Sequence, residues 1–289
     1  MDYRQYLSPE VLDFIDETLA FYPDDLDPTD WAAQRQVYNA MAAHFHAGRP
    51  EGVLVSDQSI GGIPVRLYGP ESKTTVLYAH GGGFVLGGLE SHDDVCAEIA
   101  VRTGCRVVSV DYRLSPEHPH PAAYEDAVRV ADALCAEGQV ILCGDSAGAT
   151  LCAAIAGTRA DLGFAGQVLI YPMIGYPTTG GSFDVHSNAP LLTTADLAFY
   201  ADVRGGSPYD PRLIPALGDL ASLPPTWLFP AECDPLCDDA VRYADAIQGE
   251  VHMCLHDGLV HGWLRARDRS AMTQTAFDQI INAIVRLAS

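Results

Sequence analysis

Ser146 stands in the sequence pattern G-x-S-x-G, within the stretch VILCGDSAG at residues 140–148. An apolar run precedes the pattern and a run of small residues, ATLCAAIAG, follows it, which is the order strand, sharp turn, helix. A serine on such a strained turn projects its hydroxyl above a sheet, and Gly144 and Gly148 give the clearance that the turn needs. The pattern therefore predicts that Ser146 is a nucleophile; the alternative is an ordinary glycine-rich turn.

Three consecutive glycines follow a second apolar run, in the stretch VLYAHGGGF at residues 76–84. Glycine loses much conformational freedom on folding, so such a run needs a reason, and close approach of backbone N–H groups to a ligand is one. Acyl transfer develops negative charge on a former carbonyl oxygen, which fixed N–H donors stabilise. We expect the N–H groups of Gly82, Gly83 and Ala147 to form this oxyanion hole, and we expect His80 to hold the loop by hydrogen bonds.

A serine hydroxyl is a weak nucleophile and needs a histidine to take its proton and an acid to orient that histidine. Four histidines follow Ser146: His186, His252, His256 and His261. The first lies in a long irregular segment, and the next two lie in a predicted strand, VHMCLH. Because His261 follows that strand in the loop DGLVHGW, at the carboxyl end where a base is needed, it is the predicted base, with His256 as second choice. For both, the alternative is a histidine without a catalytic role.

The predicted acid is Asp234, which comes just past the end of the strand TWLFPAE and one strand before His261. In proteins that carry the serine on such a turn, the three groups follow the chain order serine, acid, histidine. Glu232 and Asp238 are the rivals. We expect Glu232 to point along the strand, and Asp238 to cap the helix that follows.

Short apolar strands alternate with longer helical stretches from about residue 50 onward, which predicts an α/β fold with a mostly parallel eight-stranded sheet flanked by helices. The middle strands read as continuous apolar runs, as parallel strands covered on both faces do. The predicted strands are residues 52–57, 63–68, 75–80, 106–111, 139–144, 166–171, 226–231 and 250–256. The predicted helices are residues 92–103, 121–137, 147–159, 237–248 and 271–287.

Two segments depart from this alternation: residues 1–48, which are helical and amphipathic in pattern, and about 175–215, which are rich in Gly, Pro, Ser and Thr around the run TTADLAFY. Such long insertions commonly form lids or binding elements. We expect one domain over residues 1–289, with both segments forming a cap over the carboxyl edge of the sheet, where ligands of α/β proteins bind. The alternative for residues 1–48 is a helical pair that packs for stability alone.

Composition excludes several classes of function. The net charge of −21, from 38 acidic and 17 basic residues, opposes binding to nucleic acid or to anionic membranes. No stretch approaches the roughly 20 apolar residues that span a bilayer, and the acidic start does not read as a secretory signal, so we expect a cytoplasmic protein. The last strand and the last helix offer surfaces on which a homodimer could form.

The eight cysteines are expected to be reduced, because the chain has ample apolar residues for a core and needs no disulfide framework. Several lie inside apolar runs and would be small buried side chains. Cys233 and Cys237 are spaced C-x3-C without a second pair at metal-site spacing, so no metal site is predicted.

The chain carries four short motifs: HGGGF at 80–84, GDSAG at 144–148, DPL at 234–236 and HGW at 261–263. Together they resemble the hormone-sensitive-lipase-like esterases, and among these the bacterial acetyl esterases. The stretch VDYRLSPEHPHPAAYEDA at 110–127 is similar to a further segment of that family. The resemblance is strong over about 50–289 and weaker before it.

The resemblance implies the α/β-hydrolase fold with a helical cap and a preference for small acyl groups. It carries the same roles onto the matching positions: nucleophile, acid and base at Ser146, Asp234 and His261, and oxyanion donors at Gly82, Gly83 and Ala147. Trp263 stands where phenylalanine is commoner, and the cap region is compact.

The sequence thus predicts a carboxylic ester hydrolase that acts on short-chain esters by acyl transfer, with a small-molecule ester and water as its partners and without cofactor or metal. Two alternatives remain. An amidase, a deacetylase or a lactonase would use the same residues, and a non-catalytic small-molecule-binding protein can be built on the same fold.

Overall fold

A central sheet forms the scaffold of the protein in a computed structural model that describes residues 1–175 and 179–289. Residues 176–178, which belong to the second predicted cap segment, lie outside the described residues. The strands of the central sheet are β1 Val55–Ile60, β2 Ile63–Tyr68, β3 Thr74–Ala79, β4 Arg106–Val110, β5 Gln139–Asp145, β6 Gly166–Ile170, β7 Thr226–Phe229 and β9 Val251–Met253. They pair in the order β1-β2-β4-β3-β5-β6-β7-β9, and only the pairs made by β2 are antiparallel. This confirms the predicted fold class.

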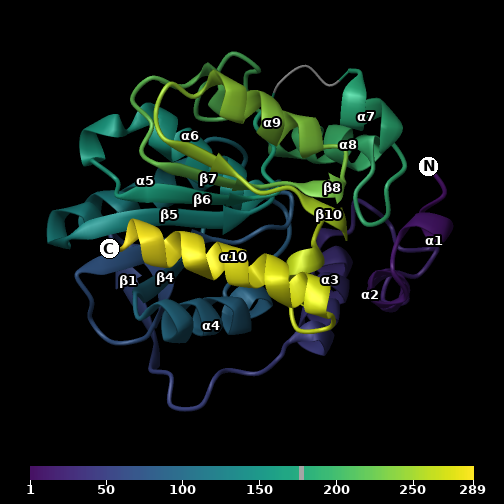
Figure 1. The fold of residues 1–289 in the computed structure, drawn as a ribbon, viewed down its shortest axis with the longest axis horizontal. Helices are drawn as coiled ribbons and strands as arrows, with labels where there is room; N and C mark the ends of the chain where they lie inside the picture. The colour runs from purple at the N-terminus through teal and green to yellow at the C-terminus, as the bar shows by residue number, and fades with distance from the viewer. Residues whose placement is uncertain (176–178) are drawn as a thin grey trace.

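Helices cover both faces of this sheet, as Figure 1 shows, with α4 and α10 on one face and α5, α6 and α9 on the other. The α-helices are α1 Tyr3–Tyr6, α2 Pro9–Leu19, α3 Trp31–Phe45, α4 Asp93–Thr103, α5 Ala122–Glu137, α6 Ala147–Thr158, α7 Gly181–Val185, α8 Thr194–Arg204, α9 Cys237–Ala246 and α10 Ala271–Leu287. Short 3-10 turns occupy Glu90–His92, Ala160–Leu162, Pro215–Leu217 and Trp263–Ala266. Within the described part of the chain, no helix combines the length and apolar character needed to cross a membrane.

The central strands are buried on both faces, which explains their continuous apolar sequences. All six residues of β3 are buried. Its side chains alternate: Val76 and Tyr78 join the apolar cluster under α4 and α10, whereas Leu77 and Ala79 join the cluster under α5 and α6. Two core layers thus hold the middle of the sheet rigidly, and the loops at its carboxyl edge start from fixed points.

The prediction of single strands at residues 226–231 and 250–256 is wrong. Pro230 has no N–H to donate, so the ladder cannot run through it, and the chain bends out of the sheet there. The continuation, β8 Ala231–Cys233, pairs in parallel with β10 His256–Val260 to make a separate two-stranded sheet. The first strand is also displaced, since β1 begins at Val55 rather than near residue 52.

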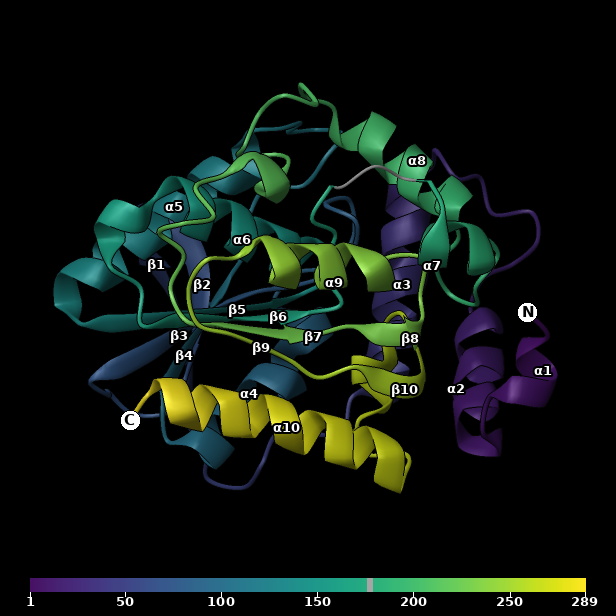
Figure 2. The same cartoon turned by 45° about the horizontal axis from the view of Figure 1, so that its top comes forward.

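The N-terminal helices lie at the carboxyl edge of the sheet, beside α7 and α8, as both views show (Figures 1 and 2). Helix α2 is amphipathic as expected and buries Val11, Phe14 and Ile15. The ring of Trp31, which begins α3, stacks on Phe199 of α8 with centroids 5.8 Å apart. The two segments that depart from the α/β alternation therefore contact each other above the sheet.

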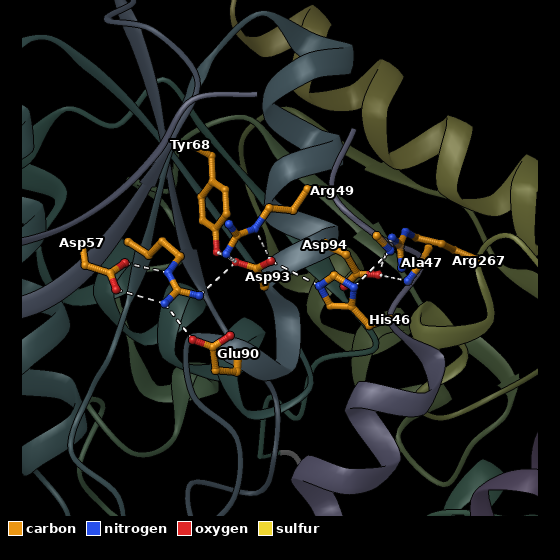
Figure 3. Close-up of polar contacts among 11 residues, drawn as sticks. His46, Ala47, Arg49, Asp57, Tyr68, Glu90, Asp93, Asp94 and Arg267 are labelled. Atoms are coloured by element: carbon orange, nitrogen blue, oxygen red, sulfur yellow. Dashed lines mark hydrogen bonds and ion pairs between the residues drawn. The ribbon is translucent and has the colours of Figure 1, made fainter. Parts of the chain in front are cut away.

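A network of charges fixes the chain after α3 to the start of α4 (Figure 3). Asp93 accepts hydrogen bonds from Arg49 at 2.6 and 2.8 Å and from Arg66 at 3.0 Å. Asp94 accepts from Arg267, which precedes α10, at 2.7 Å. Burial alone would raise the pKa of Asp93, but the hydrogen bonds from Arg49 and its other donors outweigh it and lower the pKa to about 2. Carboxylates in the first turn of a helix are favourable as well.

Candidate active site

The turn that carries Ser146 has the strained backbone that the sequence predicts. Ser146 lies between β5 and α6 with φ 52° and ψ −121°, a region that residues with a Cβ rarely adopt. A Cβ added at Gly148 would lie 1.9 Å from the carbonyl oxygen of Ala79, and one at Gly144 would lie 2.7 Å from the same atom. Only glycine therefore fits on either side of the serine, because β3 passes directly beside the turn.

Ser146, His261 and Asp234 form a continuous hydrogen-bonded chain. His261 Nε2 lies 2.8 Å from the Ser146 hydroxyl oxygen, and His261 Nδ1 lies 2.6 Å from Asp234 Oδ2. The other carboxylate oxygen of Asp234 accepts the N–H of Leu236 at 2.9 Å. The side chain of Asp234 is fully buried and that of His261 nearly so. A carboxylate, an imidazole and a hydroxyl in this order can withdraw a proton from the hydroxyl as it attacks a carbonyl.

The small sheet of β8 and β10 positions the acid and the histidine. Val260 pairs with Cys233, so the residues that follow them, His261 and Asp234, leave neighbouring parallel strands at the same edge. The ring of Tyr171, at the end of β6, lies 4.6 Å from the His261 ring, centroid to centroid. The bend at Pro230 thus has a consequence for the site, because it brings this strand pair to the end of β5.

The rival histidines and acids have other partners. His256 contacts Gln279 at 2.9 Å, and burial lowers its pKa to about 4. His186 bonds to the hydroxyl of Tyr3, and His252, stacked on Trp227, bonds to Glu250. Glu232 accepts the Tyr6 hydroxyl at 2.5 Å and the Gly258 N–H at 2.7 Å. The expectation that Asp238 caps α9 is wrong: Leu236 holds the N-cap position, and Asp238 in the first turn accepts the Ser182 N–H, so it ties α9 to α7.

The glycine loop after β3 has the geometry of a backbone donor site. Gly82 and Gly83 have φ of 123° and 62°, and a Cβ on Gly82 would lie 2.3 Å from the carbonyl oxygen of Leu86. The N–H groups of Gly82, Gly83 and Ala147 donate to no other described residue, and Ala147, as the first residue of α6, has no partner within its helix. A Cβ on Gly83 would lie 2.9 Å from the ring of Tyr200, so α8 lies against this loop.

His80 is wholly buried, and burial lowers its pKa to about 4. Its Nδ1 donates to the carbonyl oxygen of Gly81 at 2.8 Å, and its ring stacks on Tyr112 with centroids 4.3 Å apart. These contacts fit a residue that holds the loop rather than one that reacts.

Asp145, the residue before the serine, also belongs to the site, and the sequence did not lead us to expect it there. Its buried carboxylate accepts the Tyr78 hydroxyl at 2.8 Å and the Gly81 N–H at 3.0 Å, and lies 3.3 Å from His92 Nε2. It therefore ties the glycine loop to the serine turn. Burial alone would raise its pKa, but His92 and its other partners outweigh that effect and lower it. An acid between an apolar strand and G-x-S-x-G is the signal that could have revealed it.

A cavity of about 640 Å³ opens above Ser146 and His261. Its volume is in the range of small-molecule sites. Its walls come from α2 and α3, the glycine loop, the serine turn, residues 189–204 and the stretch after His261; they are mostly apolar, with the polar side chains of Tyr22, Tyr38, Arg204 and Arg265 among them. None of these four residues was expected in the site from the sequence.

The cysteine thiols take no part in the hydrogen-bonded chain from Ser146 to Asp234. All eight are free thiols, and burial raises the pKa of Cys233 and Cys237 to about 12. Among the described residues no group of histidine, cysteine and acid side chains has the arrangement to hold a metal ion.

Comparison with known proteins finds a family model described as alpha/beta hydrolase fold, which matches residues 76–265. The chain is 36% identical over 241 residues to the Esterase LipI of Mycobacterium tuberculosis, a match that covers 73% of this chain and 74% of that protein. It is 34% identical over 228 residues to the ethyl acetate hydrolase of Pseudomonas putida, covering 70% and 72%. An esterase from the bacterial hormone-sensitive lipase family superposes with a TM-score of 0.88 at 26% identity, over 98% of this chain and 99% of that one.

Proposed function

This chain belongs to the alpha/beta hydrolase family that its residues 76–265 match, as the motifs of its sequence predict, and we propose that it hydrolyses short-chain carboxylic esters with Ser146 as nucleophile. Its similarity to carboxylic ester hydrolases supports ester hydrolysis as the reaction. The observation that carries the assignment of residues is the hydrogen-bonded chain from Ser146 through His261 to Asp234.

The reaction proceeds in two acyl-transfer steps. His261 Nε2 accepts the proton of Ser146 as its oxygen attacks the ester carbonyl, and Asp234 holds the ring and stabilises the imidazolium. The protonated histidine then gives its proton to the leaving alcohol, which leaves an acyl-serine. In the second step the neutral histidine takes a proton from water, whose oxygen attacks the acyl carbon and releases the acid and the free serine.

The backbone donors stabilise the charge that develops in both steps. The N–H groups of Gly82, Gly83 and Ala147 receive the oxygen of the tetrahedral intermediate, and Asp145 keeps the glycine loop at a fixed distance from the serine turn. Because these donors are set before the substrate arrives, little reorganisation accompanies the reaction.

The two segments at about 1–48 and about 175–215 act as a cap that shapes the substrate site. They supply most of the apolar wall of the cavity, and Tyr200 of α8 restricts the space above Gly83. A wall that close to the oxyanion donors favours small acyl groups, and the similarity to an ethyl acetate hydrolase agrees with that preference.

The protein acts in the cytoplasm on a small-molecule ester and water. Eight thiols, none of them in a disulfide, are in keeping with a reducing compartment. The edge strand β9 and helix α10 are the surfaces on which a homodimer would form.

Hydrolysis of p-nitrophenyl esters from acetate to laurate tests the proposal. We expect kcat/KM to be highest for the short acyl groups and to fall along the series, because the cap limits the acyl end of the cavity. The Ser146→Ala variant should fold like the wild type and lose the activity on every ester. If the wild-type protein hydrolyses amides but no ester of the series, the esterase proposal is wrong and the protein is an amidase.

A further inference from the structure

Arg265 lies in the cavity beside the proposed base. It follows His261 by four residues, in the 3-10 turn Trp263–Ala266, and its side chain lines the cavity wall. A Cβ added at Gly262 would lie 3.2 Å from Arg265 Nη1, so the guanidinium covers the residue that directly follows His261. A positive charge thus lies within the substrate site rather than at the protein surface.

The guanidinium of Arg265 has few acceptors for its donors. A guanidinium carries five N–H donors. Among the described residues, Arg265 donates only to the hydroxyl of Tyr38, its buried Nε has no acceptor, and no carboxylate lies within ion-pair distance. Arg265 is partly buried, and a partly desolvated charge without a hydrogen-bonded counter-ion is unfavourable, so an anionic group that entered the cavity would be stabilised there.

The groups nearest Arg265 do not neutralise it at close range. Burial raises the pKa of Tyr22 to about 12, so this phenol is uncharged at neutral pH, and Tyr38 is uncharged as well because burial raises its pKa too. The carboxylate of Asp145 attracts Arg265 at longer range, but its oxygens already accept from Tyr78, Gly81 and His92. Tyr22 also lines the cavity, and its hydroxyl donates to no other described residue.

Arg204 is a second arginine of the same cavity, and it is the more deeply buried of the two. Its guanidinium carbon lies 3.6 Å from the centroid of the Phe84 ring, and Nη1 donates to the carbonyl oxygen of Leu213 at 3.3 Å. Stacking on an aromatic face and a carbonyl acceptor fix this side chain between α8 and the glycine loop. The guanidinium of Arg265 also lies over an aromatic ring, 4.9 Å from the Tyr38 centroid, but its one acceptor among the described residues is the hydroxyl of that tyrosine, and its buried Nε has none.

We propose that the cavity takes esters that carry a carboxylate, and that Arg265 binds this carboxylate with the Tyr22 hydroxyl as a second donor. The guanidinium fork matches the two oxygens of a carboxylate, and charge-assisted hydrogen bonds in an apolar cavity are strong. The substrates are then half-esters of dicarboxylic acids, or acetyl esters of hydroxy acids. This inference rests on the proposed ester hydrolysis at Ser146.

Two pairs of esters of matched shape test the proposal in wild-type protein. The first compares ethyl hydrogen succinate with ethyl levulinate, in which a methyl ketone replaces the carboxylate. The second compares γ-acetoxybutanoate with its methyl-ketone counterpart, which moves the charge to the alcohol side. Acid release is followed at about 0.15 M salt, so that the net charge of −21 is screened beyond roughly 8 Å. We expect kcat/KM to favour the anion about tenfold or more in at least one pair.

Variants at the proposed contacts identify the group responsible. Arg265→Met should bring the anion-to-neutral ratio of kcat/KM close to one, mainly through KM, because the binding charge is gone. Arg265→Lys should give an intermediate ratio, since it keeps the charge without the fork. Tyr22→Phe removes one donor at almost constant shape and should lower the ratio less. Arg286→Met, which removes an exposed arginine from α10, is the matched control and should leave the ratio unchanged.

The outcomes separate the two proposals. Equal turnover of anion and ketone in both pairs overturns the carboxylate site and leaves ester hydrolysis intact. The carboxylate site is also overturned if Arg265→Met keeps the full preference for the anion. If that variant does not fold, the same conclusion follows when both Arg265→Lys and Tyr22→Phe keep the full preference. Absence of turnover with both neutral ketone esters and with the p-nitrophenyl series contradicts the ester hydrolase itself.

Discussion

The start of α4 and the cavity at the carboxyl edge of the sheet both hold arginines that are wholly or partly buried, and the partners of these arginines differ between the two regions. Arg66 and Arg267 lie among carboxylates, with ion pairs to Asp93 at 3.0 Å and to Asp94 at 2.7 Å, as Figure 3 shows for Arg267. Among the described residues, Arg204 and Arg265 of the cavity have no carboxylate at ion-pair distance. The arginines near α4 have counter-ions within the protein, whereas those of the cavity have none at ion-pair distance among the described residues.

This difference divides the molecule by task. The network around α4 connects the chain after α3, the sheet and the start of α10, so its charges serve to hold elements together. The cavity keeps donors without an acceptor among the described residues: the Nε of Arg265 and the N–H groups of Gly82, Gly83 and Ala147. Substitutions should therefore separate activity from stability according to the region in which they fall.

The largest expected effect is that of Asp234→Asn in the cavity. An amide keeps the size of the side chain but cannot stabilise the imidazolium in the same way, so kcat should fall about 10⁴-fold. The midpoint of thermal unfolding should change little by comparison. A variant with near wild-type kcat would show that Asp234 only packs beside His261. Its charge would then serve structure alone, as the charges around α4 do.

Gly82→Ala should have the next largest effect. The added Cβ would lie 2.3 Å from the backbone oxygen of Leu86, so the loop must move, and the loss of an oxyanion donor costs about 10²–10³-fold in kcat. Steady-state kinetics with a short-chain p-nitrophenyl ester measure this. Gly62→Ala is the control for a positive φ, since nothing lies within 4 Å of a Cβ there, and it should leave kcat unchanged. Equal kinetics for the two variants would contradict the role of Gly82.

Asp93→Asn should change stability rather than activity. It removes the charge that Arg49 and Arg66 share, and hydrogen bonds to charged groups contribute about 2 kcal/mol to the free energy of unfolding. Urea unfolding at neutral pH measures the change, with the exposed ion-pair residue Asp278→Asn as the control, which should change stability by less than about 1 kcal/mol. A loss of kcat/KM in folded Asp93→Asn would contradict the claim that this network serves stability rather than activity.

The pH dependence of stability gives the smallest of these effects. The pKa of Asp93 is lowered from 3.8 to about 2, so the stabilisation it provides is complete above its ordinary pKa and disappears as pH falls through the lowered value. Between those two values the wild type should lose free energy of unfolding more steeply than Asp93→Asn. Parallel curves for the two proteins would show that Asp93 does not contribute through its charge.

Residue patterns in the sequence predicted the fold class and most strands of the central sheet, and they proposed the three side chains that the structure brings together at Ser146. The pattern around Ser146 and the glycine run were readable because each needs glycine at set positions, for reasons of backbone geometry. The break at Pro230 was missed, although proline in an inner strand was a warning against a continuous ladder. Arg265 and Tyr22 could not be assigned to the cavity, because segments 243 residues apart meet there only in the folded chain.

Covalent trapping of the nucleophile tests the central claim most directly. A fluorophosphonate that reacts with activated serines would be incubated with the wild type and with Ser146→Ala, and the labelled peptide would be identified by mass spectrometry. The account predicts one label per chain, on the peptide that contains Ser146, loss of ester hydrolysis in proportion to labelling, and no label in the variant. Active wild-type protein that carries the label on another residue, or that stays unlabelled at full inhibitor excess, would contradict it.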